Sequence, residues 1–120
     1  MSILVTGAAG FIGYHLIKKT LNKNKEVIGI DNINSYYDII LKKDRINKLK
    51  KNKKFSFYKV DLSNYKKLNN IVKKNKIKII IHLAAQAGVR YSIKNPRSYF
   101  NSNLEGFFNI LEVSRHNKIK

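Results

Sequence analysis

Three regularly spaced glycines near the start of the chain constrain its fold more than any other feature. Gly7, Gly10 and Gly13 occur in the stretch TGAAGFIG, directly after a short apolar run at residues 2–6. In a strand–turn–helix unit, the first such glycine allows a tight turn, the second lets the backbone approach a pyrophosphate, and the third lets the helix pack closely on the sheet. The free N–H groups at the start of that helix favour phosphate. The spacing therefore predicts a strand, a phosphate-binding turn and a helix, in that order.

Short apolar runs alternate with amphipathic stretches along the whole chain. Strands are predicted at residues 2–6, 26–31, 55–60 and 77–83, and the apolar run at 79–81 predicts burial on both sheet faces. Helices are predicted at 11–22 and 39–50, then from an N-cap at Ser63 to residue 75, and from Pro96 to about residue 116. This order implies an α/β fold, the N-terminal part of a Rossmann-type doubly wound parallel sheet with about four strands.

The last predicted helix carries a large apolar face, and the segment before it, residues 84–95, is predicted to be a loop. Pro96 favours a helix start because its missing N–H would be unpaired there in any case. Five apolar residues then recur at helical spacing and form one face of the helix: Phe100, Leu104, Phe107, Phe108 and Leu111.

An aspartate at the end of the second predicted strand is the expected partner of the phosphate-binding turn. Asp31 lies about 20 residues downstream of the glycines, where the acid that binds the adenosine ribose is found in dinucleotide-binding folds. Its carboxylate can accept hydrogen bonds from both ribose hydroxyls and would repel a 2′-phosphate. Asn32 supplies no cation to offset that repulsion, so NAD is favoured over NADP. The alternative is that Asp31 is an ordinary turn residue at a strand end.

A second aspartate, Asp61, follows the third predicted strand. With Leu62 it can flank an adenine, or it can simply cap the helix that follows Asn64; the sequence leaves both interpretations open. His82, within the fourth predicted strand, is predicted to be a core histidine rather than a catalyst.

Composition limits the classes of function. The sequence has no cysteine, which excludes disulfides, cysteine nucleophiles and cysteine metal sites and makes a cytoplasmic location the default; no metal site is predicted. No apolar run is long enough to span a membrane, so no membrane association is expected. The formal net charge is +18, but the lysines are spread along the chain among asparagine and isoleucine residues. They are predicted mostly at helix ends and on exposed helix faces, Lys42 and Lys43 among them, so nucleic acid is not expected as a partner. A basic nucleic-acid-binding module remains an alternative.

These residues resemble the extended short-chain dehydrogenase family of nucleotide-sugar epimerases and dehydratases, over essentially the whole chain. TGAAGFIG at 6–13, DN at 31–32, VDL at 60–62 and HLAA at 82–85 are general features of that family. Two longer stretches, residues 31–49 and 82–112, are similar to UDP-glucuronate 4-epimerases of the capsule and lipopolysaccharide type. The run QAGVRYS at 86–92 is the most specific, because UDP-galactose 4-epimerases usually differ there.

The resemblance implies NAD as cofactor and assigns contacts by position. The backbone of Phe11 and Ile12, beside Gly13, would meet the pyrophosphate. The remaining contacts follow in chain order: Asp31, Asn32, Asn34, Ser35 and Tyr36 around the adenosine ribose, Asp61 and Leu62 beside the adenine, Leu83, Ala84, Ala85 and Gln86 near the nicotinamide ribose, and Asn103 in an Asn-x-x-Gly motif that ends at Gly106.

Arg90 is the basic residue nearest the expected sugar site. We hypothesise that it contacts the substrate carboxylate; the alternative is an exposed loop arginine.

The resemblance also implies a reaction, in which NAD+ transiently removes the C4 hydride of a UDP-sugar and a tyrosine, four residues before a lysine, acts as base. The only such spacing in the chain, Tyr14 to Lys18, lies at the pyrophosphate end, so no catalytic residue is predicted within residues 1–120.

We expect the chain to stop before the fifth strand, without the catalytic and substrate-binding part, and to be inactive alone. The complete enzyme would be a homodimer. A 4,6-dehydratase, a UDP-glucose or UDP-galactose 4-epimerase and a non-catalytic NAD-binding module are the alternatives.

Overall fold

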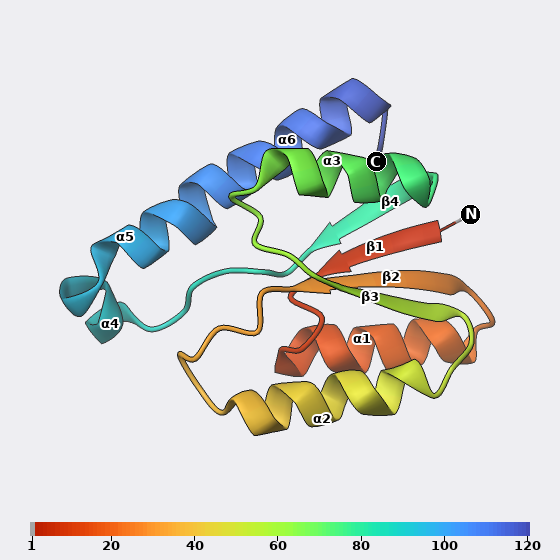
Figure 1. Cartoon of the computed structure of the whole chain (residues 1–120), viewed down its shortest axis with the longest axis horizontal. Helices are drawn as coiled ribbons and strands as arrows, with labels where there is room; N and C mark the ends of the chain where they lie inside the picture. Colours follow the sequence, from red (N-terminus) through yellow and green to blue (C-terminus); the bar gives the residue numbers. More distant parts are fainter. Residues whose placement is uncertain (1) are drawn as a thin grey trace.

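The computed structural model describes residues 2–120, which form a four-stranded parallel sheet covered by helices (Figure 1). The strand order is β3-β2-β1-β4, so the chain moves outward from β1 to β3 and then crosses to the other side of β1. Such a reversal places a crevice at the carboxyl ends of the central strands. The strands are β1 (Ser2–Thr6), β2 (Glu26–Asp31), β3 (Phe55–Lys59) and β4 (Ile77–His82).

Helices cover both faces of the sheet. In Figure 1, α1 (Phe11–Asn22) and α2 (Ile39–Lys50) lie on one face, and α3 (Tyr65–Lys74) and α6 (Gly106–Asn117) lie on the other. Each face has its own apolar core: Ile17 and Ile46 pack with Val5 and Val27, whereas Leu68 packs on the opposite face. The sequence prediction of a doubly wound α/β sheet is confirmed.

The fourth strand lies at an edge of the sheet. Ile80 and Ile81 pack against opposite core clusters but remain half-buried, because β4 has a neighbouring strand on one side only. On its outer side, the amide of Ile80 donates to the carbonyl of Lys120 at 2.9 Å, and the amide of Lys120 donates to the carbonyl of Lys78 at 3.2 Å. The backbone of Lys120 therefore makes two hydrogen bonds to β4.

A threonine hydroxyl joins the ends of β1 and β4. Thr6 Oγ1 is fully buried and accepts from the amides of Leu83 at 3.0 Å and Ala84 at 3.1 Å. Its own hydrogen is then free to donate to His82 Nδ1, 2.7 Å away. Burial lowers the pKa of His82, which keeps the ring neutral and able to accept. His82 is hydrogen-bonded but only half-buried, so it lies at the border of the core predicted for it, and the segment after β4 is held against the end of β1.

Two predictions about the helices that follow β3 and β4 are wrong. Ser63 does not cap α3; Asn64 does, with its side chain accepting from the Lys67 amide at 3.1 Å, because the Ser63 hydroxyl donates to Asp61 instead. The segment predicted as a loop at 84–95 contains a short helix, α4 (Val89–Lys94). Its side chains are largely exposed, so no apolar periodicity toward the core marked it in the sequence.

The long helix predicted from Pro96 is divided into three parts. It begins as expected with α5 (Pro96–Tyr99), widens into a π-helical turn, η1 (Phe100–Glu105), and continues as α6 to residue 117. A π-helical turn rotates the following residues relative to a uniform helix. The side of α6 that packs on the core consists of Gly106, Asn109, Ile110 and Val113.

The predicted apolar face of this helix is therefore not the buried one. All five of its side chains are between 47% and 62% exposed: Phe100, Leu104, Phe107, Phe108 and Leu111. Within residues 2–120, no helix has the length and apolar character needed to cross a membrane.

The strand–turn–helix unit at the start of the chain depends on close backbone packing. A Cβ atom on Gly13 would overlap the carbonyl oxygen of Gly7, which belongs to fixed backbone. A Cβ atom on Gly10 would lie 3.2 Å from the same oxygen, and Gly10 has φ −74°, which alanine adopts freely. Gly7 has φ +72°, a region that glycine favours. The turn thus tolerates a side chain at Gly10 far better than at Gly13.

We predict that Gly13→Ala lowers the free energy of unfolding by about 1–3 kcal/mol or more, because α1 must move away from the turn. Gly10→Ala is the matched control and should cost about 1 kcal/mol or less. Urea denaturation of both variants measures the difference. Equal stability of the two variants would show that the close approach of α1 to Gly7 does not constrain the fold.

Candidate functional site

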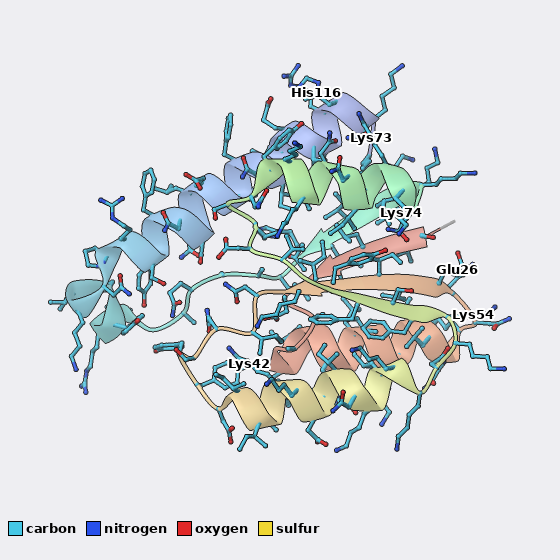
Figure 2. The ribbon with its side chains drawn as sticks, in the orientation of Figure 1. Glu26, Lys42, Lys54, Lys73, Lys74 and His116 are labelled. Carbon is cyan, nitrogen blue, oxygen red and sulfur yellow. The ribbon has the colours of Figure 1, made fainter. Side chains whose placement is uncertain are left out.

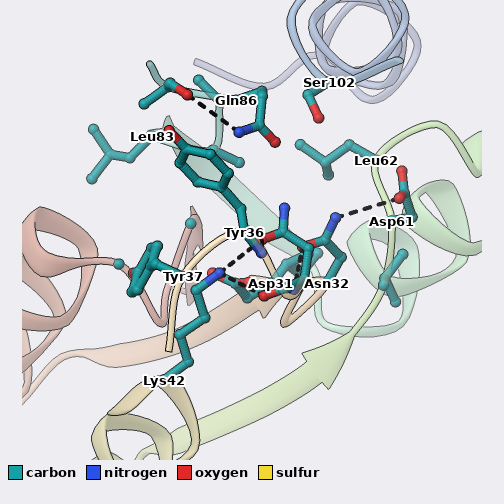
Figure 3. Close-up of a pocket in the computed structure, with 18 residues that line it drawn as sticks. Asp31, Asn32, Tyr36, Tyr37, Lys42, Asp61, Leu62, Leu83, Gln86 and Ser102 are labelled. Carbon is teal, nitrogen blue, oxygen red and sulfur yellow. Dashed lines mark hydrogen bonds between the residues drawn. The ribbon is translucent and has the colours of Figure 1, made fainter. Parts of the chain in front are cut away.

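A crevice opens at the carboxyl edge of the sheet, where the segments after all four strands meet (Figure 3). The turn after β1, the end of β2, and the segments after β3 and β4 each contribute to its walls, as expected for the reversal of strand order. Twelve of the residues predicted to bind a cofactor line it: Gly7, Gly10, Asp31, Asn32, Asn34, Tyr36, Asp61, Leu62, Leu83, Ala84, Ala85 and Gln86.

The phosphate-binding turn presents unpaired backbone donors. No side chain caps the N-terminus of α1, and Tyr14 is the first residue of the helix whose amide bonds backward, to the carbonyl of Gly10 at 2.9 Å. The amides of Phe11 and Ile12 precede it in the first turn, and both residues are 67% exposed. Neither Phe11 nor Ile12 is among the residues that line the crevice, so a contact of their backbone with a pyrophosphate stays a prediction. Exposed N–H groups at a helix N-terminus are suited to an anion.

Asp31 connects the turn after β1 to the loop after β2. Its Oδ2 accepts from the amide of Ala9 at 3.0 Å, and its Oδ1 accepts from the amide of Ile33 at 2.8 Å. A carboxylate can accept about four hydrogen bonds, so each oxygen retains capacity on the crevice side. The arrangement provides a fixed, acceptor-only group opposite the glycine turn, which is suited to a pair of hydroxyls.

Asp61 occupies the next strand end along the crevice. Its carboxylate accepts from the Ser63 amide at 2.9 Å and lies 3.4 Å from the side-chain amide of Asn32. Burial raises the pKa of Asp61, but the hydrogen bonds from Ser63 and Asn32 lower it by more, so the pKa lies below its usual value. Asp61 therefore stays ionised and organises the start of the α3 segment while its side chain lines the crevice.

The segment after β4 is held by the π-helical turn. Asn103 accepts from the Gln86 amide at 2.8 Å and donates to the Gln86 carbonyl at 3.1 Å, so its side chain fixes the backbone of that residue. The Gln86 side chain is itself buried and accepts from Ser98 at 2.9 Å. Asn103 therefore lies behind the crevice wall, and its neighbour Ser102 lines the crevice.

Some predicted residues lie outside the crevice. Ser35 is exposed on the loop after β2, and Gly13 lies beneath the turn, packed against Gly7. Arg90 is exposed on α4 and does not line the crevice. Among residues 2–120, no group of three or more histidine, aspartate or glutamate side chains is arranged to hold a metal ion.

Sequence reasoning missed one charged residue that lines the crevice. Lys42 on α2 is buried, and its position was visible in the sequence, because it precedes Ile46 and Leu49 at helical spacing on the face that packs on the core. A lysine on an otherwise apolar face is a signal of a specific partner. The other lining residues that were missed are Ile30, Tyr37, Val60, Ala87 and Ser102.

Known proteins are similar to this chain in sequence and in fold. Protein CapI of Staphylococcus aureus is 52% identical over 120 residues, which are 100% of this chain and 36% of that protein. The UDP-glucuronate 4-epimerase of Thermodesulfobacterium geofontis is 45% identical over 117 residues, 98% of this chain and 36% of that protein. This chain thus spans 36% of the length of these curated relatives.

The fold comparison agrees. The crystal structure of UDP-glucuronic acid 4-epimerase from Bacillus cereus, in complex with UDP-glucuronic acid and NAD, matches with a TM-score of 0.87 and 38% identity. The match covers 97% of this chain and 37% of that one. A family model described as GDP-mannose 4,6 dehydratase matches residues 4–120. Because that match extends over almost all of the sequence, the chain belongs to the GDP-mannose 4,6 dehydratase family.

Proposed function

We propose that this chain is the NAD-binding part of a UDP-glucuronate 4-epimerase. The observation that carries the proposal is the crevice in which Gly7 and Gly10 lie opposite Asp31. Relatives named UDP-glucuronate 4-epimerase, and a similar structure solved with NAD and UDP-glucuronic acid, support this assignment. Because the chain spans 36% of the length of such relatives, the activity of the whole protein is part of the proposal.

The turn after β1 and the end of β2 fit the pyrophosphate and the adenosine ribose of a dinucleotide. The exposed amides of Phe11 and Ile12 would receive the pyrophosphate, which can approach closely because Gly7 and Gly10 have no side chains. The fixed carboxylate of Asp31 would accept from the two hydroxyls of the adenosine ribose. When bound, NAD+ would supply the hydride acceptor for transient oxidation at C4 of the sugar.

The remaining contacts follow the crevice wall. Around the ribose we assign residues from the loop after β2, and we assign Asp61 and Leu62 to the adenine. The segment after β4, fixed by Asn103, would lie near the nicotinamide ribose. The full sets are Asn32, Asn34, Ser35 and Tyr36 for the ribose, and Leu83, Ala84, Ala85 and Gln86 for the nicotinamide side.

We assign the catalytic base to a part of the enzyme outside residues 1–120. The tyrosine and lysine at the one Tyr-x-x-x-Lys spacing, Tyr14 and Lys18, line a groove between α1 and α2 and not the crevice. Residues 1–120 would thus bind the cofactor, and a following part would bind the sugar and move the C4 proton. On its own the chain would not turn over substrate.

The exposed apolar face of η1 and α6 supports a further part of the proposal. Its five apolar side chains are all exposed and lie on one side of the helix, and a contiguous exposed apolar surface of this kind marks a contact with another part of a protein. In the complete enzyme we expect the following part of the chain, or the second subunit of a homodimer, to cover it. The absence of cysteine is in keeping with an enzyme of the cytoplasm.

A nucleotide-sugar 4,6-dehydratase is the second candidate, because the matching family model carries the description GDP-mannose 4,6 dehydratase. Both reactions begin with oxidation at C4, so the crevice serves either. They differ in the acid–base groups of the sugar site.

We predict that the complete protein converts UDP-glucuronate to UDP-galacturonate, its C4 epimer, and that residues 1–120 alone give no product. Chromatography of the sugar nucleotides after incubation with NAD+ measures both. Water loss from GDP-mannose in place of epimerisation would favour the dehydratase. Cofactor binding without turnover of any nucleotide sugar by the complete protein would leave a non-catalytic NAD-binding module.

We predict that Asp31→Asn weakens NAD binding about 10–100-fold, because a charged acceptor for the ribose hydroxyls becomes a neutral one. The preference for NAD over NADP should shrink, since the repulsion of a 2′-phosphate is removed. Calorimetric titration with both cofactors gives the two affinities. Asp44→Asn, at an exposed aspartate on α2, is the matched control and should bind like wild type. An unchanged cofactor preference in the Asp31 variant would exclude the ribose assignment.

We predict that Arg90→Gln in the complete protein weakens UDP-glucuronate binding more than UDP-glucose binding, because only the former has a carboxylate for the guanidinium. Arg97→Gln, at an exposed arginine on α5, is the control. Equilibrium titration with each sugar nucleotide measures the effect. Equal losses for the two ligands would remove the carboxylate contact.

A further inference from the structure

One lysine of this lysine-rich chain is buried beside the crevice. Lys42 is 4% exposed and is the only charged side chain that is buried among residues 2–120. In Figure 2, Lys54, Lys73 and Lys74 lie at one end of the molecule, whereas Lys42 lies toward the other, between α2 and the loop after β2. Burial of an ammonium group is costly unless it has specific partners, so its contacts require an explanation.

The ammonium group of Lys42 holds a single residue of the loop after β2. Its Nζ donates to the carbonyl oxygen of Asn34 at 2.9 Å and to the side-chain oxygen of Asn34 at 2.8 Å (Figure 3). It also lies 4.0 Å from the centre of the Tyr37 ring, a cation–π distance. Burial lowers the pKa of Lys42, and nearby Asp31 acts in the opposite direction. Two charge-assisted bonds and an aromatic ring thus offset the cost of burial.

Asn34 connects the ammonium group to a chain of short-range hydrogen bonds through the loop. The Asn34 side chain accepts from the Tyr36 amide at 3.3 Å, and the Asn34 amide donates to the Asn32 side chain at 3.2 Å. At the start of the loop, Asp31 holds the Ile33 amide. The loop is therefore fixed at Asp31 by the sheet and at Asn34 by Lys42, and Asn32, Asn34 and Tyr36 face the crevice between and beside these points.

A second cationic residue of α2 is hydrogen-bonded to the turn after β1, on the other side of the crevice. Arg45, one helical turn after Lys42, donates to the carbonyl of Ala9 at 3.0 Å and lies 3.3 Å from the hydroxyl of Tyr37. Ala9 belongs to the glycine turn and donates its own amide to Asp31. One face of α2 thus contacts both the turn after β1 and the loop after β2.

We propose that Lys42 is a positioning residue for the adenosine half of the bound dinucleotide. Its ammonium group holds Asn34 and Tyr37, and through them it keeps the loop after β2 in the conformation that meets the adenosine ribose. This inference rests on the proposed NAD-binding function. It goes beyond the carboxylate of Asp31, because it assigns the shape of the ribose site to a cation that is hydrogen-bonded to the loop after β2.

The first experiment needs no cofactor, so its result is independent of the proposed function. Lys42→Met keeps the apolar stem and removes the ammonium group, and Lys43→Met removes the charge of an exposed neighbour on the same helix. We expect amide hydrogen exchange at Asn34 and Tyr36 to rise at least tenfold in the Lys42 variant and to stay at the wild-type rate in the Lys43 variant. Unchanged exchange in the Lys42 variant would overturn the proposal.

The second experiment measures binding of NAD and ADP-ribose by calorimetry. In Lys42→Met both affinities should fall about tenfold or more, by the same factor, because ADP-ribose retains the adenosine half. Lys43→Met should remain within twofold of wild type. In the double variant Lys42→Met with Asn34→Ala, affinity should fall by less than the product of the two single losses. The reason is that both substitutions remove the same hydrogen bond between Lys42 and Asn34.

Two outcomes separate this inference from its alternatives. A lower urea midpoint for Lys42→Met with unchanged affinities and unchanged exchange would mean that the lysine only stabilises the fold, and would overturn the proposal. Wild-type protein that binds neither NAD nor ADP-ribose would contradict the proposed function, and with it the cofactor role of Lys42, even if the exchange result shows that Lys42 orders the loop.

Discussion

The carboxylate of Asp31 links the two parts of the chain that the proposed site requires. One oxygen holds the Ala9 amide in the turn after β1, and the other holds the Ile33 amide in the loop after β2. Asp31 ends a central strand, so the sheet fixes the position of both contacts. The turn and the loop are therefore fixed relative to each other, so the proposed phosphate and ribose sites lie on two segments that one carboxylate joins.

Two cationic side chains, Lys42 and Arg45, contact the segments that Asp31 joins, although the chain as a whole is strongly basic. Most lysines are exposed, and only Lys42 is buried and held by the crevice loop. Arg45 contacts the glycine turn through the Ala9 carbonyl. The net charge of the chain therefore does not indicate where the site lies. The two cations on one face of α2 do, because they contact the loop and the turn that border the crevice. The proposed phosphate site would be formed by the backbone N–H groups at the start of α1 and not by lysine side chains.

Much of the fold and of the crevice could be predicted from the sequence. The helices at 11–22 and 39–50 and the strand at 26–31 have the predicted bounds, since glycine, aspartate and clear apolar periodicity mark their ends. The twelve predicted residues that share the crevice do so because the carboxyl ends of parallel strands meet at one edge. Whether those residues bind a cofactor stays a prediction.

The errors have physical causes. Apolar residues lie on two sides of α6, and their spacing alone does not distinguish the side that packs on the core: Phe107, Phe108 and Leu111 are exposed, whereas Ile110 and Val113 are buried. Ser63 was expected to cap α3, but a neighbouring carboxylate, Asp61, competes for its hydroxyl. The prediction that Lys42 lies with Lys43 on an exposed helix face is wrong, because the spacing from Lys42 to Ile46 and Leu49 places it on the buried face of α2.

A crystal structure of the protein with NAD bound would test the central claim most directly. The account predicts the pyrophosphate over Gly7 and Gly10, within hydrogen-bond distance of the Phe11 and Ile12 amides, and both adenosine ribose hydroxyls on the Asp31 carboxylate. A dinucleotide bound away from the carboxyl edge of the sheet, or one whose adenosine ribose does not contact Asp31, would contradict it.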